Sequence, residues 1–129
     1  MGSIRDRVKA VQDRRTEPYT VKDWNDEKVL LAGLDNDGQA WLVGLMIGKE
    51  HDEVMAEIIR NAPGLVRQGV LDPETREPVF KAGDEDWLRH KSGHVIGEIA
   101  LKIVDLTKIM GGDDEVDAAK NVSAPDPAS

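Results

Sequence analysis

The feature that most constrains the fold is a long apolar periodicity between Asp84 and Met110. At about 100° per residue, one broad face of this segment collects Leu88, Val95, Ile96, Ile99, Ile103, Leu106 and Met110. Asp84 predicts the N-cap and Gly111–Gly112 the end of the helix. Such a face must pack against other elements, because an isolated amphipathic helix is marginal in water. We therefore expect a helical domain built around this segment.

A thinner amphipathic segment opens the chain. Between Ser3 and Arg15, the apolar residues Ile4, Val8 and Val11 recur at spacings of four and three, and Ser3 predicts an N-cap. We expect a helical arm over about residues 3–15, ended by Glu17–Pro18. Three apolar residues are too few for independent stability, so the arm should dock on another surface.

A second helix is predicted from Lys49 to Ala62. Pro63–Gly64 marks its end. Its apolar residues repeat at spacings of three and four and indicate one buried face. They are Val54, Met55, Ile58, Ile59 and Ala62.

Several shorter segments favour strands and turns. Tyr19–Trp24 and Lys28–Leu34 each predict a short strand. Asp72–Arg76 has Pro at the second turn position and predicts a small hairpin between Leu65–Leu71 and Glu77–Phe80.

Residues 35–48 allow two interpretations. Asp37–Gly38 is typical of a hairpin turn, whereas Asn36 and Gln39 form a capping box for a helix. We favour the helix.

Together these elements predict an α+β fold, mainly α-helical with a small β-hairpin. We place one domain at residues 1–112 and a disordered acidic tail at 113–129. The tail has five acidic residues against one lysine, which is −4 of the net charge of −8, and almost nothing to bury.

Charge and composition exclude several classes of function. The net charge of −8 argues against nucleic acid, because such binding rests on neutralised phosphates. The longest nearly uncharged apolar stretch, Ala40–Gly48, is far shorter than the roughly 20 residues of a membrane span. The chain has no cysteine, which removes disulfides, thiolate nucleophiles and cysteine-based zinc sites. We expect a cytosolic protein with no membrane or nucleic-acid partner.

One set of side chains has metal-ligand spacing. His90, His94 and Glu98 recur every fourth residue on one face of the long predicted helix. Lys91 and Lys102 nearby would repel a cation, so we interpret this face as solvated. No serine lies in a nucleophile elbow and no glycine-rich phosphate loop occurs. We predict no catalytic residue, no metal and no cofactor, and hence no enzyme.

Leu101 and Ile109 lie apart from the main apolar stripe of the long segment. They point toward its polar side. They are either scattered surface residues or a second contact used in self-association.

Four groups of residues along the chain carry a family resemblance. They are Ser3–Val8 with Glu17–Pro18 and Trp24, then Val70–Phe80, then Trp87–Leu88, and finally Ala118–Asn121. These segments resemble tail assembly chaperones of long-tailed (siphovirus-type) bacteriophages, over about residues 3 to 121. Arg76 stands where many of those relatives carry glycine.

The resemblance implies a chaperone of the host bacterial cytoplasm that binds and solubilises the tape-measure protein. It also implies promotion of tail-tube assembly, a homo-oligomer, and absence from the mature virion. Ribosomal frameshifting near the end of the gene would make an extended form that recruits the tail tube protein. We predict that the surface facing the client or a second copy uses Ile4, Val8, Val11, Leu101 and Ile109.

Two other classes of protein remain open. A structural head-tail connector or completion protein would share the size and acidity but would stay in purified particles. A small metal-dependent enzyme would bind zinc or manganese through His90, His94 and Glu98.

Overall fold

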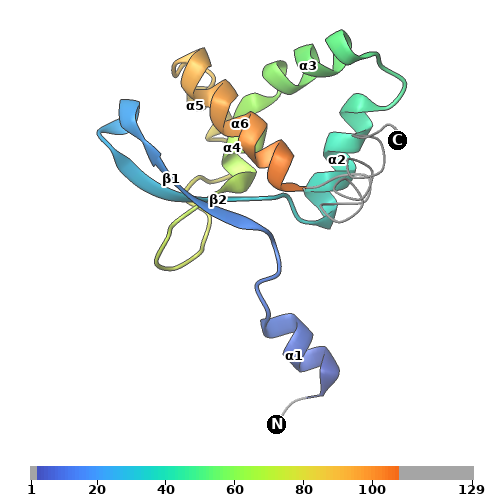
Figure 1. Ribbon diagram of the computed structural model, residues 1–129, viewed down its shortest axis with the longest axis vertical. Coiled ribbons are helices and arrows are strands. Elements are labelled where there is room, and N and C mark those ends of the chain that lie inside the picture. Colours follow the sequence, from blue (N-terminus) through green and yellow to red (C-terminus); the bar gives the residue numbers. More distant parts are fainter. Residues whose placement is uncertain (1–2, 108–129) are drawn as a thin grey trace, which may run out of the picture.

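The computed structural model describes residues 3–107 and has a mainly helical α+β fold with a small antiparallel sheet (Figure 1). This confirms the predicted fold class. The elements, in chain order, are α1 (Ile4–Ala10), β1 (Thr16–Val21), the short 3₁₀ helix η1 (Lys22–Trp24), β2 (Glu27–Ala32), α2 (Asn36–Met46), α3 (His51–Arg60), α4 (Ala62–Gly69), β3 (Val70–Leu71), α5 (Glu85–Leu88) and α6 (Gly93–Thr107).

The sheet has three antiparallel strands in the order β1-β2-β3. Tyr19 pairs with Val29 across β1 and β2, so a strand forms in each of the two predicted segments. The first strand was predicted to continue to Trp24, which was wrong, because Lys22–Trp24 forms η1. The expectation that Glu17–Pro18 ends the first helix was wrong, because α1 stops at Ala10 and Pro18 lies inside β1. β1 is an edge strand, where a residue without a backbone N–H is tolerated.

The chain between α3 and β3 is helical rather than extended. The predicted stop at Pro63–Gly64 was wrong, because Pro63 lies in the first turn of α4. A missing N–H costs nothing there, since the first amides of a helix have no intrahelical acceptor. The hairpin is correspondingly short, with β3 limited to Val70–Leu71 and a single bridge from Leu71 to Pro78.

The predicted turn itself is present. Asp72 Oδ1 accepts hydrogen bonds from the amides of Glu74 at 2.8 Å and Thr75 at 3.0 Å. The amide of Asp72 donates to the carbonyl of Glu77 at 2.8 Å and closes the loop.

The helical interpretation of residues 35–48 is confirmed by α2. Its cap lies one residue earlier than expected, because Asp35 Oδ1, rather than Asn36, accepts from the Gly38 amide at 2.8 Å. The next helix, α3, starts with a capping box in which the Glu50 amide donates to Glu53 Oε1 at 3.0 Å.

The single helix expected from Asp84 is two helices. α5 ends at Leu88 and α6 begins at Gly93, so residues 89–92 form a turn between them. Ser92 Oγ accepts from the Val95 amide at 3.5 Å, so this serine helps to start a new helix instead of continuing the first one. The predicted end at Met110 to Gly112 and the tail at 113–129 lie outside the described residues.

The core lies between α6, α4 and the inner face of the sheet. On α6 the predicted apolar face is buried at Val95, Ile96, Ile99 and Ile103. Figure 1 shows α6 running across the body, with α1 standing apart from it. None of the helices formed by residues 3–107 has the length and apolar character that a membrane span requires.

Candidate protein-binding surfaces

The N-terminal arm, residues 3–15, exposes its apolar stripe. Ile4, Val8 and Val11 are 70%, 63% and 61% exposed, and α1 has no buried residue. Ser3 Oγ accepts from the Asp6 amide at 3.2 Å, which confirms the predicted cap. A helix of this length is marginal in water by itself, so its exposed stripe is suited to docking.

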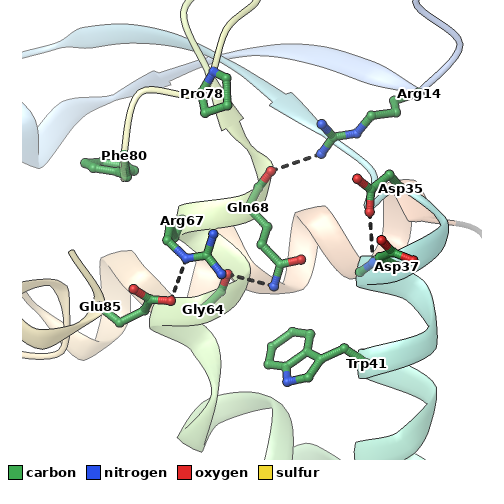
Figure 2. A pocket seen from close by; sticks show the side chains of 11 residues that line it. Arg14, Asp35, Asp37, Trp41, Gly64, Arg67, Gln68, Pro78, Phe80 and Glu85 are labelled. Carbon is green, nitrogen blue, oxygen red and sulfur yellow. Dashed lines mark hydrogen bonds and ion pairs between the residues drawn. The ribbon is translucent and has the colours of Figure 1, made fainter. Parts of the chain in front are cut away.

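Arg14 joins the arm to the body (Figure 2). Its Nε donates to the carbonyl of Gly33 at 2.6 Å, and its Nη2 donates to the carbonyl of Gln68 at 3.0 Å. The Gly33 amide donates to the carbonyl of Arg15 at 2.8 Å. The chain is therefore held to the body from Arg14 onward.

A pocket of about 530 Å³ surrounds this anchor. Its lining comes from the arm, α2, α4, the segment after β3, and α5 (Figure 2): Arg14, Asp35, Asp37, Gly38, Trp41, Gly64, Arg67, Gln68, Pro78, Phe80 and Glu85. Arg67 Nε donates to Glu85 Oε2 at 2.5 Å, and Gln68 Nε2 donates to the Gly64 carbonyl at 3.2 Å. These polar groups hold the elements of the fold together.

The surroundings of Glu85 in this pocket lower its pKa. Burial works to raise that pKa, but backbone amides and the Arg67 guanidinium outweigh burial and hold it below its ordinary value. The carboxylate is therefore stabilised in its charged form by the elements that it joins.

A second, more apolar hollow runs along the outer side of α6, and we call it the α6 groove. It encloses about 590 Å³ and is lined by Glu17, Ile59, Gly93, His94, Gly97, Glu98, Leu101, Lys102 and Asp105. Leu101 is 41% exposed, in agreement with its predicted position away from the main stripe. A Cβ added at Gly93 or Gly97 would meet nothing within 4 Å, so both glycines leave the groove open.

Ile59 was not predicted as a surface residue. It was expected on the buried face of α3 but is 59% exposed, while the neighbouring Ile58 is 4% exposed. Two adjacent residues differ by about 100° around a helix, so one of the pair had to leave a narrow buried face. Only the packing of α3 decided which one, and it placed Ile59 in the groove with Leu101.

The rim of the α6 groove is mainly acidic. Glu17, Glu98 and Asp105 contribute carboxylates against the single ammonium of Lys102. Lys102 Nζ lies 5.5 Å from the centre of the Tyr19 ring. Burial, and then the Glu98 charge, raise the pKa of Tyr19.

The proposed metal-ligand face is only partly assembled. His94 Nε2 lies 3.7 Å from Glu98 Oε1, but His90 falls in the turn between α5 and α6 instead of one helical turn before His94. Across residues 3–107 no three His, Cys, Asp or Glu side chains are grouped so that they could hold a metal ion.

An aromatic cluster was missed by the sequence analysis. Phe80 packs edge-on against Trp24 and Trp87, with ring centres 6.1 Å and 5.7 Å away, and Lys91 Nζ lies 5.8 Å from the Trp87 ring. Trp87 remains 46% exposed. The sequence offered one clue to this cluster, which is how few aromatic residues the chain has. There are three tryptophans, one tyrosine and one phenylalanine, and three of these five meet here.

Comparison with known proteins identifies the fold. No protein-family model matches the chain, and no curated protein matches its sequence. Among solved structures, the chain is similar to the tail assembly chaperone of bacteriophage HK97, with a TM-score of 0.58 and 19% identity over 81% of this chain and 98% of that one. The fold is that of a phage tail assembly chaperone. The resemblance drawn from the sequence is thus confirmed at the level of the fold.

Proposed function

We propose that the chain is a phage tail assembly chaperone that binds and solubilises the tape-measure protein, promotes tail-tube assembly, and is not retained in the mature virion. The observation that carries this proposal is the fold shared with 98% of the HK97 tail assembly chaperone. The proposal includes action in the host bacterial cytoplasm, a homo-oligomer, and a frameshifted extended form that recruits the tail tube protein.

The surface is suited to holding an apolar client in solution. Such a protein needs exposed apolar residues to cover its client and enough net charge to keep the complex soluble. Ile4, Val8, Val11 and Leu101 are exposed on a chain with a net charge of −8. Ile109 completes the proposed surface and lies outside the described residues.

The aromatic cluster gives the client a second surface. Aromatic side chains are enriched in protein interfaces because they bury a large area with few rotatable bonds. Trp87 lies on α5, exposed, and its Nε1 donates to Asp84 Oδ1 at 3.1 Å, which orients the ring. We assign Trp87 to the contact with the tape-measure protein.

Co-expression with the tape-measure protein of the same phage tests the proposal. The client should remain in the soluble fraction with the wild-type chain and precipitate without it. Two variants should each lower the soluble fraction of the client. One is Trp87→Ala, and the other combines alanine substitutions at Ile4, Val8, Val11, Leu101 and Ile109. Ile47→Ala is the matched control, because Ile47 is 72% exposed but belongs to neither surface. A client that is equally soluble without the chain would contradict the proposal.

The purified virion separates this proposal from the structural alternative. Mass spectrometry of intact particles should lack the chain if it is an assembly chaperone. A stoichiometric amount in the particle would instead indicate a head-tail connector or completion protein.

A further inference from the structure

We propose that the aromatic cluster and the hollow beside it bind an arginine side chain of the tape-measure protein. We call this site the aromatic pocket, and it encloses about 350 Å³. Its lining residues are Asp23, Trp24, Asn25, Phe80, Trp87 and Lys91. The inference rests on the proposed function and adds the chemistry of the client group that is bound. It also gives Lys91 a role, as a cation of the chain itself that the arginine displaces.

The walls of the aromatic pocket suit a cation. The face of an aromatic ring attracts a cation within about 6 Å of its centre, and tryptophan attracts it most strongly. Two of the three rings are tryptophans, and Trp87 keeps 46% of its surface exposed. Phe80 lies at 82° to the ring of Trp24 and at 70° to that of Trp87. Rings at such angles form the walls of a hollow rather than a stack.

Hydrogen bonds hold the exposed wall of the aromatic pocket in place. Trp87 Nε1 donates to Asp84 Oδ1 at 3.1 Å, and Asp84 Oδ2 accepts from the Lys81 amide at 2.8 Å. A site whose groups are already ordered loses less conformational entropy when it binds a ligand. The ring of Trp87 is therefore oriented before a client arrives.

A cation of the chain already marks the binding position. Lys91 Nζ lies 5.8 Å from the centre of the Trp87 ring, and Lys91 belongs to the turn between α5 and α6. The lysine is exposed, so its ammonium group can move into water. An exposed contact between a cation and a ring is weak, and a ligand that binds the ring better can replace it.

Arginine is the side chain that fits this exchange. Its guanidinium group is planar, stacks on aromatic faces and is more weakly hydrated than an ammonium group. Asp23 lines the same pocket and is exposed. A carboxylate accepts two parallel hydrogen bonds from a guanidinium group, a geometry that the point charge of lysine does not offer. Trp87 and Asp23 together therefore favour arginine over lysine.

The charge of the body favours a basic client segment. Residues 16–107 have ten basic and eighteen acidic side chains, a net charge of −8. The connection that carries Trp24 and Asp23, residues 22–27, has one basic and three acidic side chains. Such a surface attracts a cationic segment and repels an acidic one.

Peptides of the client test the site on the full chain. An array of overlapping peptides that spans the tape-measure protein of the same phage supplies the probe, which is the peptide bound most tightly. This peptide should contain an arginine whose replacement by citrulline, which keeps the shape but not the charge, weakens binding about tenfold. Replacement by lysine should weaken binding about threefold.

Nuclear magnetic resonance locates the bound peptide. The indole N–H signals of Trp24 and Trp87 should shift when the arginine peptide is added. The signal of Trp41 should stay in place, because Trp41 lines the pocket around Arg14 and not the aromatic pocket. The three tryptophans therefore provide both the readout and its control.

Variants of the chain distinguish a cation site from a merely apolar one. Trp87→Leu keeps an apolar side chain but removes the ring, so it should weaken binding of the arginine peptide about tenfold and abolish its advantage over the citrulline peptide. Asp23→Asn should weaken binding about threefold or more. Lys91→Ala should strengthen binding about twofold or more, because the internal competitor is gone. A gain of binding cannot come from a misfolded chain.

Two control variants remove the same charges elsewhere. Lys49→Ala and Asp52→Asn change exposed residues that do not line the aromatic pocket. Both variants should bind the arginine peptide like the wild type. Circular dichroism should show the same helix content in every variant.

Co-expression links the site to the full client. Glutamine in place of the identified arginine of the tape-measure protein should lower the soluble fraction of the client with the wild-type chain. The same change should have no further effect with Trp87→Leu, because both substitutions remove one shared contact.

Several outcomes would overturn the inference. Tightly bound peptides that lack arginine would do so, as would equal binding of the arginine and citrulline peptides or weaker binding by Lys91→Ala. A shift of the Trp41 signal alone would place the peptide elsewhere. A client that the chain keeps soluble regardless of any arginine refutes this site and leaves the proposed function standing. A client that is soluble without the chain contradicts the proposed function itself.

Discussion

Gly69 of α4 lies directly against Ile103 of α6. A Cβ added to Gly69 would lie 2.5 Å from Ile103 Cδ1 and 2.8 Å from Cγ1, closer than side chains approach each other. Ile103 is fully buried, so its side chain can move only by displacing its neighbours in a closely packed core. The two helices can therefore meet at this distance only because residue 69 has no side chain.

Gly69→Ala should lower the free energy of unfolding by about 1–3 kcal/mol, the usual cost of an overpacked core. Gly44→Ala is the matched control, because Gly44 lies within α2 with nothing near an added Cβ. It should raise stability by about 0.5–1 kcal/mol through helix propensity. Urea unfolding of both variants checks the pair, and equal effects would contradict the close approach of α4 and α6.

Arg76 adopts a φ of +63°, in the left-handed region that glycine tolerates best. Arg76→Gly should therefore raise the free energy of unfolding by about 0.5–1 kcal/mol, after the greater flexibility of the unfolded chain is counted. Arg89→Gly is the control, since Arg89 has a φ of −65°. It should be neutral or destabilising in the same thermal or urea titration.

Asp35 and Asn36 distinguish the observed cap of α2 from the one expected on the sequence. Asp35→Ala removes the acceptor of the Gly38 amide and should cost about 1 kcal/mol. Asn36→Ala should change stability by a few tenths of a kcal/mol, since this residue is already the first of the helix. A larger loss of stability in Asn36→Ala than in Asp35→Ala would indicate that Asn36, the residue expected from the sequence, is the N-cap.

Arg14→Ala should destabilise the body as well as release the arm. Two backbone carbonyls, of Gly33 and Gln68, lose a charged donor, for which the expected cost is about 1–3 kcal/mol. Arg5→Ala is the control, because the Arg5 side chain is 78% exposed. The measurement is the urea midpoint, together with the rate of proteolysis before residue 14, which should rise only in Arg14→Ala.

The lowered pKa of Glu85 predicts a pH dependence. A carboxyl whose pKa is lower in the folded than in the unfolded state stabilises the fold above its ordinary pKa of 4.5, and this contribution is lost as the pH falls through the lowered value. Glu85→Gln should therefore be less stable than the wild type by about 1 kcal/mol at pH 7, with the difference shrinking toward pH 3. A difference that stays constant between these two pH values would rule out the ionised pair with Arg67.

Local patterns were enough to predict several elements. The buried side of α6, the strands β1 and β2, the Asp72 turn and the start of the arm at Ser3 all follow from periodicity or from a side chain that bonds to a nearby amide. These interactions join residues within a few positions of each other or repeat at the period of the backbone. Neighbouring residues therefore carry the whole signal.

Other features needed the packed structure. Pro18 and Pro63 were both interpreted as helix ends, yet one lies in an edge strand and the other starts α4. The proline ring is tolerated both in an edge strand and in the first turn of a helix. Only the tertiary contacts of the flanking residues decide which of the two forms. The break between α5 and α6 is of this kind too, because Leu88 and Val95 keep a spacing of seven that also fits one continuous helix, although no apolar residue lies between them.

By itself, the sequence determined the fold class, the exposed arm and the position of Leu101 away from the core stripe. Only the tertiary structure decided that Ile59 joins Leu101 in one groove and that Trp24, Phe80 and Trp87 meet. The reason is physical. Periodicity in the sequence shows which side of a helix or strand is apolar. A binding surface, however, is formed by elements that are far apart in the chain. Their relative placement depends on how all their apolar faces pack together.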